Sequence, residues 1–190
     1  MSEVNLIRQA CQGDQEAWSA LVRQQQEAVF RLAYLLLGDA DEASDVAQET
    51  FIRAFQTLGS HFDMERPLRP WLLRITTNLV HNRRRSVGRY LAALGRFFWV
   101  DETRGVVPGP GDEQLPRWEA QALWQAVRRL DRADQEIIYL RYFLELSVAE
   151  TAETTGIAPG TVKSRLHRAL SRLRTVVETA FPVLQEERSE

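Results

Sequence analysis

The chain has 190 residues, a formal net charge of −2 at pH 7 and a hydrophobic content of 44%, ordinary values for a soluble globular protein. Its single cysteine excludes an intrachain disulfide and a multi-cysteine zinc site, and its three histidines lie too far apart in sequence for metal-ligand spacing. No stretch approaches the roughly 20 apolar residues of a membrane span, and the charged N-terminus lacks a signal core. A cytoplasmic protein without membrane insertion is therefore expected.

The sequence lacks any constellation of acid, base, nucleophile or metal ligands, and it has no glycine-rich phosphate loop. We therefore expect no enzymatic activity, no catalytic residue, no bound metal and no cofactor. The function is expected to lie in binding, and the charge pattern indicates what is bound.

The charges are strongly segregated along the chain. Residues 39–49 hold five acids and no base, residues 66–100 hold eight arginines and no acid, and residues 159–177 hold five basic residues and no acid. One acidic and two basic segments predict two kinds of partner, and binding to a polyanion such as nucleic acid suits the basic pair.

Helical periodicity dominates the sequence and strand-like alternation is absent, which predicts an all-α fold. In the first half, helices are expected over residues 3–12, 14–37, 39–58 and 70–85. Asp14 is expected to cap the second helix, Gly38 to end it, and Pro70 to occupy the first turn of the fourth. One side of the third helix is expected to face the core: Ala43, Ala47, Phe51, Ala54, Phe55 and Leu58.

The opposite side of the third helix is acidic. Asp41, Asp45 and Gln48 fall within about 60° of one another, with Glu49 beside them. The helix dipole explains acids in the first turn, but Asp45, Gln48 and Glu49 lie too far along the helix for that effect. These residues therefore indicate a surface for a basic protein partner.

The helix after Pro70 carries a polar ladder. Its members, four or three residues apart, are Arg74, Asn78, His81 and Arg85. Such a ladder, with three consecutive arginines at its end, suits contact with a nucleic-acid backbone and an exposed base. Trp71 is expected to lie in the core with Ile75 and Leu79 rather than to serve as a stacking platform.

A linker is expected over residues 89–117, because glycine and proline interrupt every pattern there. Its apolar beginning, Tyr90–Val100, is expected to pack on the first module as a short helix, and docking to a partner is the alternative. Two small helical domains follow from this division, over residues 1–88 and 118–185, with a tail at 186–190.

In the second domain, helices are expected over residues 118–130, 132–145, 148–155 and 159–178. Ser147 with Glu150 forms a capping box, and Gly156 is placed to end the short third helix. A short helix, a tight turn containing glycine and a longer basic helix form the pattern of a helix-turn-helix.

The last helix has an apolar side and a polar side. The side expected to pack on the core holds Val162, Leu166, Ala169, Leu170 and Leu173. The side expected to contact DNA holds Thr161, Lys163, Ser164, Arg165, His167, Arg168 and Arg172. Early residues of such a helix reach base edges, whereas Arg172 is expected to meet phosphate. A solvated charged face is the alternative, which the absence of acids and the preceding turn disfavour.

Three motifs carry a resemblance to the extracytoplasmic-function (ECF) sigma factors of bacterial RNA polymerase. GDADEASDVAQETFIRAFQTL (Gly38–Leu58) resembles the second-region helix of that family, and RPWLLRITTNLVHNRRR (Arg69–Arg85) resembles the helix that follows it. The segment Leu130–Arg174, closing in GTVKSRLHRALSRLR, resembles their fourth-region helix-turn-helix. The three motifs occur in the family's order, and the resemblance as a whole covers about 150 of the 190 residues.

The resemblance implies partners and roles. The acidic helix would dock on the β′ coiled coil of core RNA polymerase, with the β subunit as a further partner. The loop Ser60–Arg69 and the next helix would open and recognise the −10 promoter element, without ATP. The residues of this helix that would contact the −10 element are Arg74, Asn78, His81, Asn82 and Arg85. The last helix would recognise the −35 element, and an anti-sigma factor would hold the protein inactive until a stress or envelope signal arrives.

Leu68 departs from the family pattern, which has an aromatic residue before the Trp-Leu pair, so the base preference at the −10 element is not implied. An alternative from another class is a transcriptional regulator with a helical signal-receiving domain and a helix-turn-helix. The acidic helix and the basic ladder outside the helix-turn-helix argue against that alternative.

Overall fold

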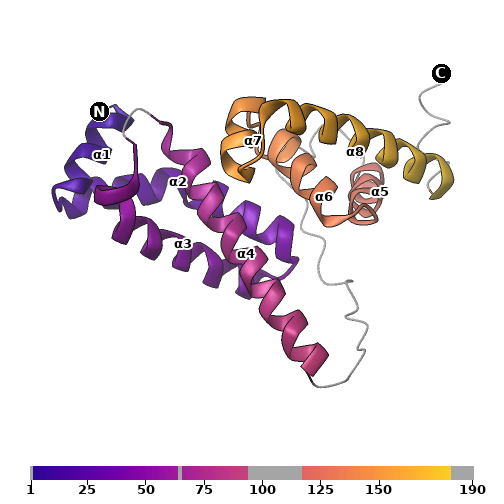
Figure 1. Cartoon of the computed structure of the whole chain (residues 1–190), viewed down its shortest axis with the longest axis horizontal. Helices are drawn as coiled ribbons and strands as arrows, with labels where there is room; N and C mark the ends of the chain where they lie inside the picture. The colour runs from indigo at the N-terminus through magenta and orange to yellow at the C-terminus, as the bar shows by residue number, and fades with distance from the viewer. Residues whose placement is uncertain (1, 64–65, 94–116, 181–190) are drawn as a thin grey trace. The chain divides into compact units, whose positions relative to one another are not determined.

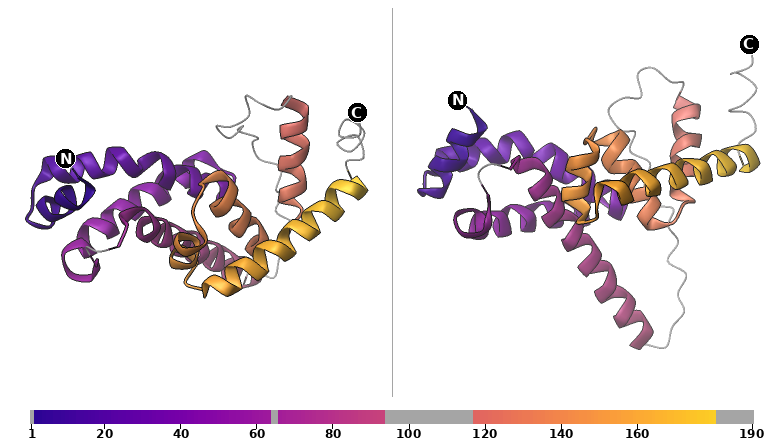
Figure 2. Two further views of the ribbon diagram at one scale, coloured as in Figure 1. Left: turned by 90° about the horizontal axis from the view of Figure 1, so that it is seen from above. Right: turned by 45° about the horizontal axis from the view of Figure 1, so that its top comes forward.

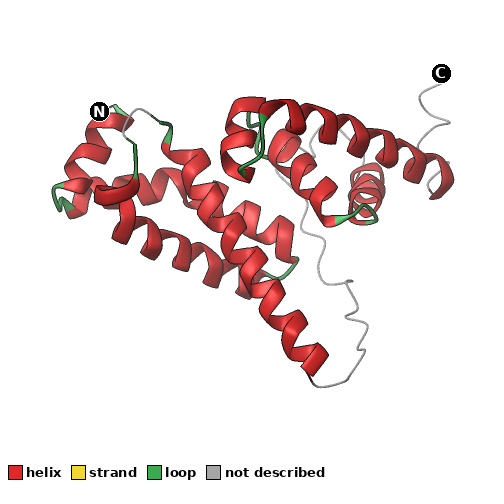
Figure 3. Ribbon diagram, viewed as in Figure 1, coloured by secondary structure: helices red, strands yellow, loops and turns green. Residues whose placement is uncertain are grey.

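The computed structural model describes residues 2–63, 66–93 and 117–180. The contacts divide the chain into two compact units, one built mainly on α1–α4 and the other mainly on α5–α8 (Figure 1). The secondary-structure elements of the described residues are all helical (Figure 3), as the periodicity predicts.

The N-terminal unit consists of α1 (Glu3–Cys11), α2 (Gln15–Leu37), α3 (Ala40–His61) and α4 (Leu68–Ala93). Helix α2 packs against each of the other three, and α3 packs against α4. Their fully buried side chains form the core of this unit: Ile7, Leu21, Val29, Leu32, Leu68, Leu72, Leu73 and Val80.

The predicted ends of α2 are confirmed, with the expected chemistry. The carboxylate of Asp14 accepts hydrogen bonds from the backbone N–H groups of Glu16 and Ala17 at 2.9 and 3.1 Å. Gly38 ends the helix with φ +77°, in the left-handed region that favours glycine, and its N–H donates to the Tyr34 carbonyl.

Helices α3 and α4 are both longer than the sequence predicts. Helix α3 continues through Gly59 to His61, because one glycine costs a helix only about 1 kcal/mol relative to alanine. Helix α4 begins two residues before Pro70, whose missing N–H does no harm in a first turn that has no partners for these donors. It then continues past Arg85 to Ala93, so the start of Tyr90–Val100 is helical, and the remainder lies outside the described residues.

The buried side of α3 is rotated from its predicted position. The side chains that it buries are Ala43, Val46, Thr50, Ala54 and Leu58. Phe51 is only half-buried and Phe55 is 55% exposed, so the predicted core position of Phe55 is wrong. Phe55 lies about 120° from Ala43 around the helix axis, and the stripe is centred on the small polar Thr50 instead.

The C-terminal unit is built mainly on α5 (Arg117–Arg128), α6 (Arg132–Ile138), α7 (Val148–Thr155) and α8 (Pro159–Ala180). The single helix predicted over residues 132–145 is divided, because α6 gives way to a π-helical turn over Tyr139–Phe143. There the Leu144 N–H donates to the Tyr139 carbonyl at 3.0 Å, five residues back. Trp124 of α5 packs on Tyr139 and Phe143, with ring centroids 5.5 and 5.7 Å apart.

The predicted helix-turn-helix is confirmed as α7 and α8. Ser147 and Glu150 form the capping box at the start of α7, with side-chain bonds to each other's N–H groups at 2.7 and 3.2 Å. Gly156 follows α7 with φ +72°. The much longer α8 then begins at Pro159 (Figure 2).

The core under the helix-turn-helix is small and apolar. Ile137, Ala152 and Val162 are buried together, with partly buried hydrophobic side chains of α7, the turn and α8 packed around them. The prediction that Val162 and Ala169 face the core is confirmed. Leu170, expected on the same side, is instead 36% exposed, because it lies about 100° from Ala169 around the axis.

Candidate functional site

The acidic residues of α3 share one exposed side. Asp41, Asp45 and Gln48 are all exposed, and Glu49 lies beside them. Two of these acids have cationic partners, one on α3 itself and one on α4. Glu49 pairs with Arg53 at 2.7 Å, and Asp45 pairs with Arg83 of α4 at 3.2 Å. Such exposed ion pairs contribute less than about 1 kcal/mol, so an incoming partner can replace them.

The same side of α3 becomes apolar further along the helix. Ile52 and Phe55 are 46% and 55% exposed, and Trp18 of α2 packs against Phe55 with ring centroids 5.3 Å apart. Residues spaced by four and three fall within about 80° around the axis and form one strip. We call this strip the α3 outer face, defined by Asp41, Asp45, Gln48, Ile52 and Phe55.

Sequence reasoning missed the apolar part of the α3 outer face. Phe55 fits a core pattern read from the apolar residues alone, whereas the spacing from Asp41 through Gln48 to Phe55 would have placed it outside. The exposed phenylalanine and isoleucine, continuous with the acids, make the α3 outer face a candidate interaction surface.

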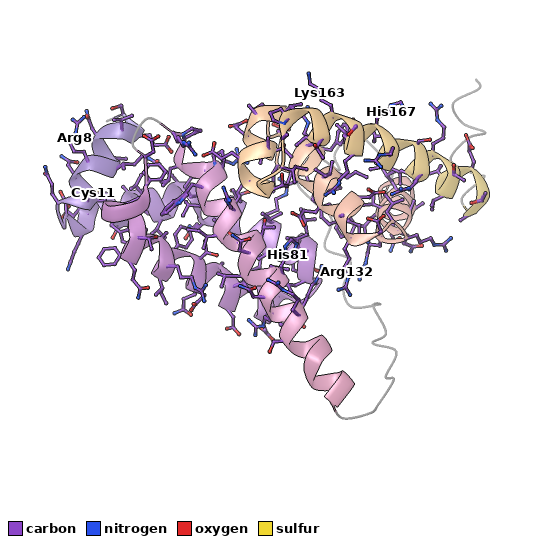
Figure 4. The ribbon with its side chains drawn as sticks, in the orientation of Figure 1. Arg8, Cys11, His81, Arg132, Lys163 and His167 are labelled. Carbon is purple, nitrogen blue, oxygen red and sulfur yellow. The ribbon has the colours of Figure 1, made fainter. Side chains whose placement is uncertain are left out.

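The polar ladder of α4 is confirmed as an exposed row of side chains. The exposed residues are Arg74, Asn78, His81, Asn82 and Arg85. Figure 4 labels His81, which shows where this row lies on α4. Arg85 donates to the side-chain amide oxygen Oδ1 of Asn82, which groups a cation and an amide at one end of the row. Trp71, expected in the core, is half-buried and packs on Phe62 with ring centroids 4.9 Å apart.

The three consecutive arginines of α4 have three different surroundings. Arg83 pairs with Asp45, Arg85 bonds to Asn82, and the half-buried Arg84 donates to the Leu36 carbonyl near the end of α2. Cationic side chains at helix C-termini stabilise the unpaired carbonyls there. Arg84 therefore holds α4 to α2, and it is the neighbouring arginines that lie outward.

The early turns of α8 present donors to solvent. Thr161, Lys163, Ser164, His167 and Arg168 are exposed and Arg165 is half-buried, and Figure 4 shows Lys163 and His167 along this helix. Arg168 Nε donates to the Ser164 carbonyl at 3.3 Å. Buried Val162 and Ala169 hold the opposite side in the core, so this row of polar side chains faces outward. Lysine and arginine at these positions suit guanine edges in a major groove.

Arg172 differs from the other basic residues of α8. Its Nη1 atom pairs with Asp131 Oδ2 at 3.0 Å and with the carboxylate of Asp134, both at the start of α6. The phosphate contact expected for Arg172 stays a prediction, but the structure shows this guanidinium engaged within its own unit.

No group of three or more His, Cys, Asp or Glu side chains suited to a metal ion is present within residues 2–63, 66–93 and 117–180. Among the helices that the structure describes, none has the length and apolar content needed to cross a membrane.

Family models match both units. A model described as Sigma-70 region 2 matches residues 21–90, which include the α3 outer face and the α4 ladder. A model described as Sigma-70, region 4 matches residues 120–173, which include the helix-turn-helix. The alternative of a regulator with a signal-receiving domain is not favoured, because the N-terminal unit matches a sigma region.

Curated relatives align over most of the chain. It is 35% identical over 174 residues to the ECF RNA polymerase sigma factor SigW of Bacillus subtilis, covering 88% of this chain and 92% of that protein. It is 33% identical over 159 residues to the ECF RNA polymerase sigma factor SigL of Mycobacterium tuberculosis, covering 84% and 88%.

Two solved structures are similar over nearly their whole length. The structure of CnrH in complex with the cytosolic domain of CnrY has a TM-score of 0.69 and 25% identity, covering 94% of this chain and 98% of that one. The sigma factor RpoE in complex with the anti-sigma factor NepR from Bartonella quintana has a TM-score of 0.70 and 27% identity, covering 85% and 97%. With both sigma regions matched in order, the chain belongs to the ECF family of RNA polymerase sigma factors, which direct transcription initiation.

Proposed function

We propose that three exposed faces divide the work of promoter recognition. The α3 outer face binds core polymerase, the α4 ladder binds the −10 element, and the first turns of α8 recognise the −35 element. The segregation of side-chain chemistry carries this proposal: acids and exposed apolar groups lie on α3, cations and amides lie on α4, and cations and hydroxyl groups lie on α8.

Core docking follows from the two halves of the α3 outer face. Its acidic half suits a basic surface and repels DNA. In its apolar half, burial of Ile52 and Phe55 away from water stabilises a complex. A helical partner with basic and apolar residues in line matches both halves. The β′ coiled coil of core polymerase is the proposed occupant, with the β subunit as a further contact of the chain.

Recognition of the −10 element uses the amides of α4. Asn78 and Asn82 offer donors and an acceptor to a base that has left the stack, and Arg74 and Arg85 provide charge for the backbone. Trapping an unstacked base stabilises the melted state directly. Strand opening therefore requires no ATP and no catalytic residue, so the protein is not an enzyme.

At the −35 element, Lys163, Ser164 and Arg168 lie in the first turns of α8, which enter the major groove in a helix-turn-helix protein. Thr161 and Arg165 flank them, and His167 either bonds within the groove or rests against a sugar. The −35 contacts provide affinity for the duplex before melting, because this element stays double-stranded.

We further propose control by an anti-sigma factor in the cytoplasm, released by a stress or envelope signal. RpoE was solved with the anti-sigma factor NepR, and CnrH with the cytosolic domain of CnrY. The exposed apolar part of the α3 outer face provides a surface that a regulator can cover in place of polymerase.

In vitro transcription with bacterial core polymerase and a randomised promoter library tests the proposed function. The expected result is initiation that depends on this chain and selects one −10 and one −35 sequence. A transcript yield no higher than that of core polymerase alone, from every promoter in the library, would contradict it.

A further inference from the structure

Arg172 lies on α8 but is directed toward its own unit. Its Nη1 atom lies 3.0 Å from Asp131 Oδ2 and also contacts the carboxylate of Asp134. Asp134 is only 3% exposed, whereas the Asp131 and Arg172 side chains are about half-exposed. One arginine therefore joins the recognition helix to two acids of another helix.

The two acids already have a local role in α6. The Asp131 carboxylate caps the helix by accepting from the Asp134 N–H at 2.9 Å, and Asp134 lies in the first turn, so both acids are at the end where the helix dipole favours negative charge. A nearly buried carboxylate nevertheless requires a cationic or hydrogen-bonding partner, because desolvation opposes its charge. Arg172 provides that partner from a position 38 residues further along the chain.

The ion pair complements the apolar anchor of α8. Val162 is buried near the start of the helix with Ile137 and Ala152, and Arg172 follows ten residues later, about 15 Å along the axis. The ion pair to Asp131 and to the nearly buried Asp134 adds a directional contact to this apolar packing. The residues proposed to read bases, Lys163 and Arg168, lie between these two anchors.

We propose that Arg172 is a positioning residue, which orients α8 for −35 recognition by pairing with Asp131 and Asp134 rather than by contacting phosphate. This inference rests on the proposed function of α8, and it names the contact that fixes the orientation of α8 within its unit. The ion pair acts by orienting Lys163 and Arg168, so its loss lowers the discrimination between −35 sequences.

The test measures holoenzyme binding to a −35 library at several salt concentrations, well below the melting temperature of each variant. Arg172→Ala is expected to lower discrimination between preferred and scrambled −35 sequences by roughly fivefold to tenfold, with Arg172→Lys retaining part of it. The slope of log affinity against log salt should stay that of the wild type. A slope reduced by about one, with unchanged sequence preference, would overturn the proposal in favour of a phosphate contact.

Asp134→Asn separates the two roles by the sign of its effect. A positioning pair predicts lower −35 discrimination, as for Arg172→Ala, although the variant removes an acid and leaves every basic residue in place. A phosphate contact predicts tighter DNA binding, because Arg172 is released from a competing carboxylate. Tighter binding with intact discrimination would overturn the inference.

Two controls address net charge and stability. Arg174→Ala removes the same charge from the same helix, and it should leave the −35 discrimination unchanged. Gln135→Ala removes bonds of 3.0 and 2.8 Å to the Arg128 and Leu130 carbonyls, so it weakens the junction of α5 and α6 and leaves the side chains of the Arg172 ion pair in place. Equal loss of discrimination in Gln135→Ala would show a general stability effect and would overturn the positioning role.

A wild-type holoenzyme without any −35 preference would contradict the proposed function of α8, and thermal melting then tests the pair by itself. A double-mutant cycle of Arg172→Ala and Asp134→Asn should show non-additive shifts in melting temperature. Additive shifts would mean that the two side chains do not stabilise each other, which would overturn the inference.

Discussion

Thr50 and Phe55 are five residues apart on α3, and their surroundings are opposite. Thr50 is fully buried, its hydroxyl donates to the Val46 carbonyl at 2.8 Å, and it lies 3.3 Å from the Thr76 hydroxyl of α4. Phe55 is 55% exposed. A polar residue is accepted inside because its hydrogen bond is made, and an aromatic residue remains outside where a partner can cover it.

Phe55→Gln provides a test of that arrangement. Because Phe55 is more than half exposed and packs on Trp18, the free energy of unfolding should fall by only about 0.5–1.5 kcal/mol in urea denaturation. Affinity for core polymerase should fall several-fold, since the apolar half of the docking surface is lost. Leu58→Ala, at a buried position three residues further on, should instead cost about 2–5 kcal/mol of stability. A comparable stability loss in Phe55→Gln would place Phe55 in the core.

Asn78 is the residue through which the −10 proposal is most directly tested. Asn78→Ala should impair open-complex formation more than closed-complex binding, because the proposed base contact exists only after melting. Permanganate footprinting measures the opening, and a pre-melted promoter bubble should restore part of the activity. Normal footprints on duplex promoters would show that Asn78 is only a surface residue of α4.

At the scale of the element, α3 is a helix with one buried and one outward side. Asp45→Arg combined with Gln48→Ala should abolish co-purification with core polymerase and leave the helical circular dichroism spectrum unchanged. The Asp45–Arg83 pair that this variant breaks is exposed and weak, so folding loses less than about 1 kcal/mol. Undiminished core binding by the folded variant would remove α3 from the mechanism.

The Asp45–Arg83 pair calls for one further variant. Arg83→Gln breaks the same ion pair but leaves Asp45 in place. This variant should retain core binding if Asp45 itself contacts core polymerase. Loss of core binding in Arg83→Gln alone would assign the effect to Arg83, or to the link between α3 and α4.

Helix α8 likewise has separate tasks along its length. Arg168→Ala should cost about 1–3 kcal/mol of promoter affinity and relax preference at one or two −35 positions. The measurement is holoenzyme binding to a −35 library. Such a library shows at which base pair the preference is lost, and that base pair is the one that Arg168 contacts. Identical sequence profiles for wild type and variant would leave this helix as a general phosphate clamp.

For the whole molecule, the division into two units with separate cores predicts independent effects. The free-energy penalties of Asn78→Ala and Arg168→Ala on promoter opening should add within about 0.5 kcal/mol in the double variant. A pre-melted bubble should relieve only the Asn78 part, since the −35 duplex is unaffected by melting. Strong non-additivity in open-complex assays would mean that the two units recognise the promoter cooperatively.

The sequence by itself determined what depends on neighbours along the chain. Helical periodicity, the caps at Asp14 and Ser147 and the glycine stop at Gly38 follow from local hydrogen bonding and backbone conformation, which a few consecutive residues decide. The acidic and basic segments, the α4 ladder and the helix-turn-helix were predictable for the same reason. Side-chain spacing places a residue around a helix axis whatever packs against it.

The tertiary structure alone decided which side of each helix its neighbours cover and which long side chains bond to another helix. The spacing of Phe55 fits both the apolar stripe and the row of acids on α3, and only the packing of the neighbouring helices around Thr50 decides that it is exposed. Arg84 and Arg172 look like DNA-binding residues in a basic run, yet their partners are 48 and 38 residues away in sequence. An arginine side chain is long enough to reach a carbonyl or carboxylate on another helix, so its role depends on folded distances.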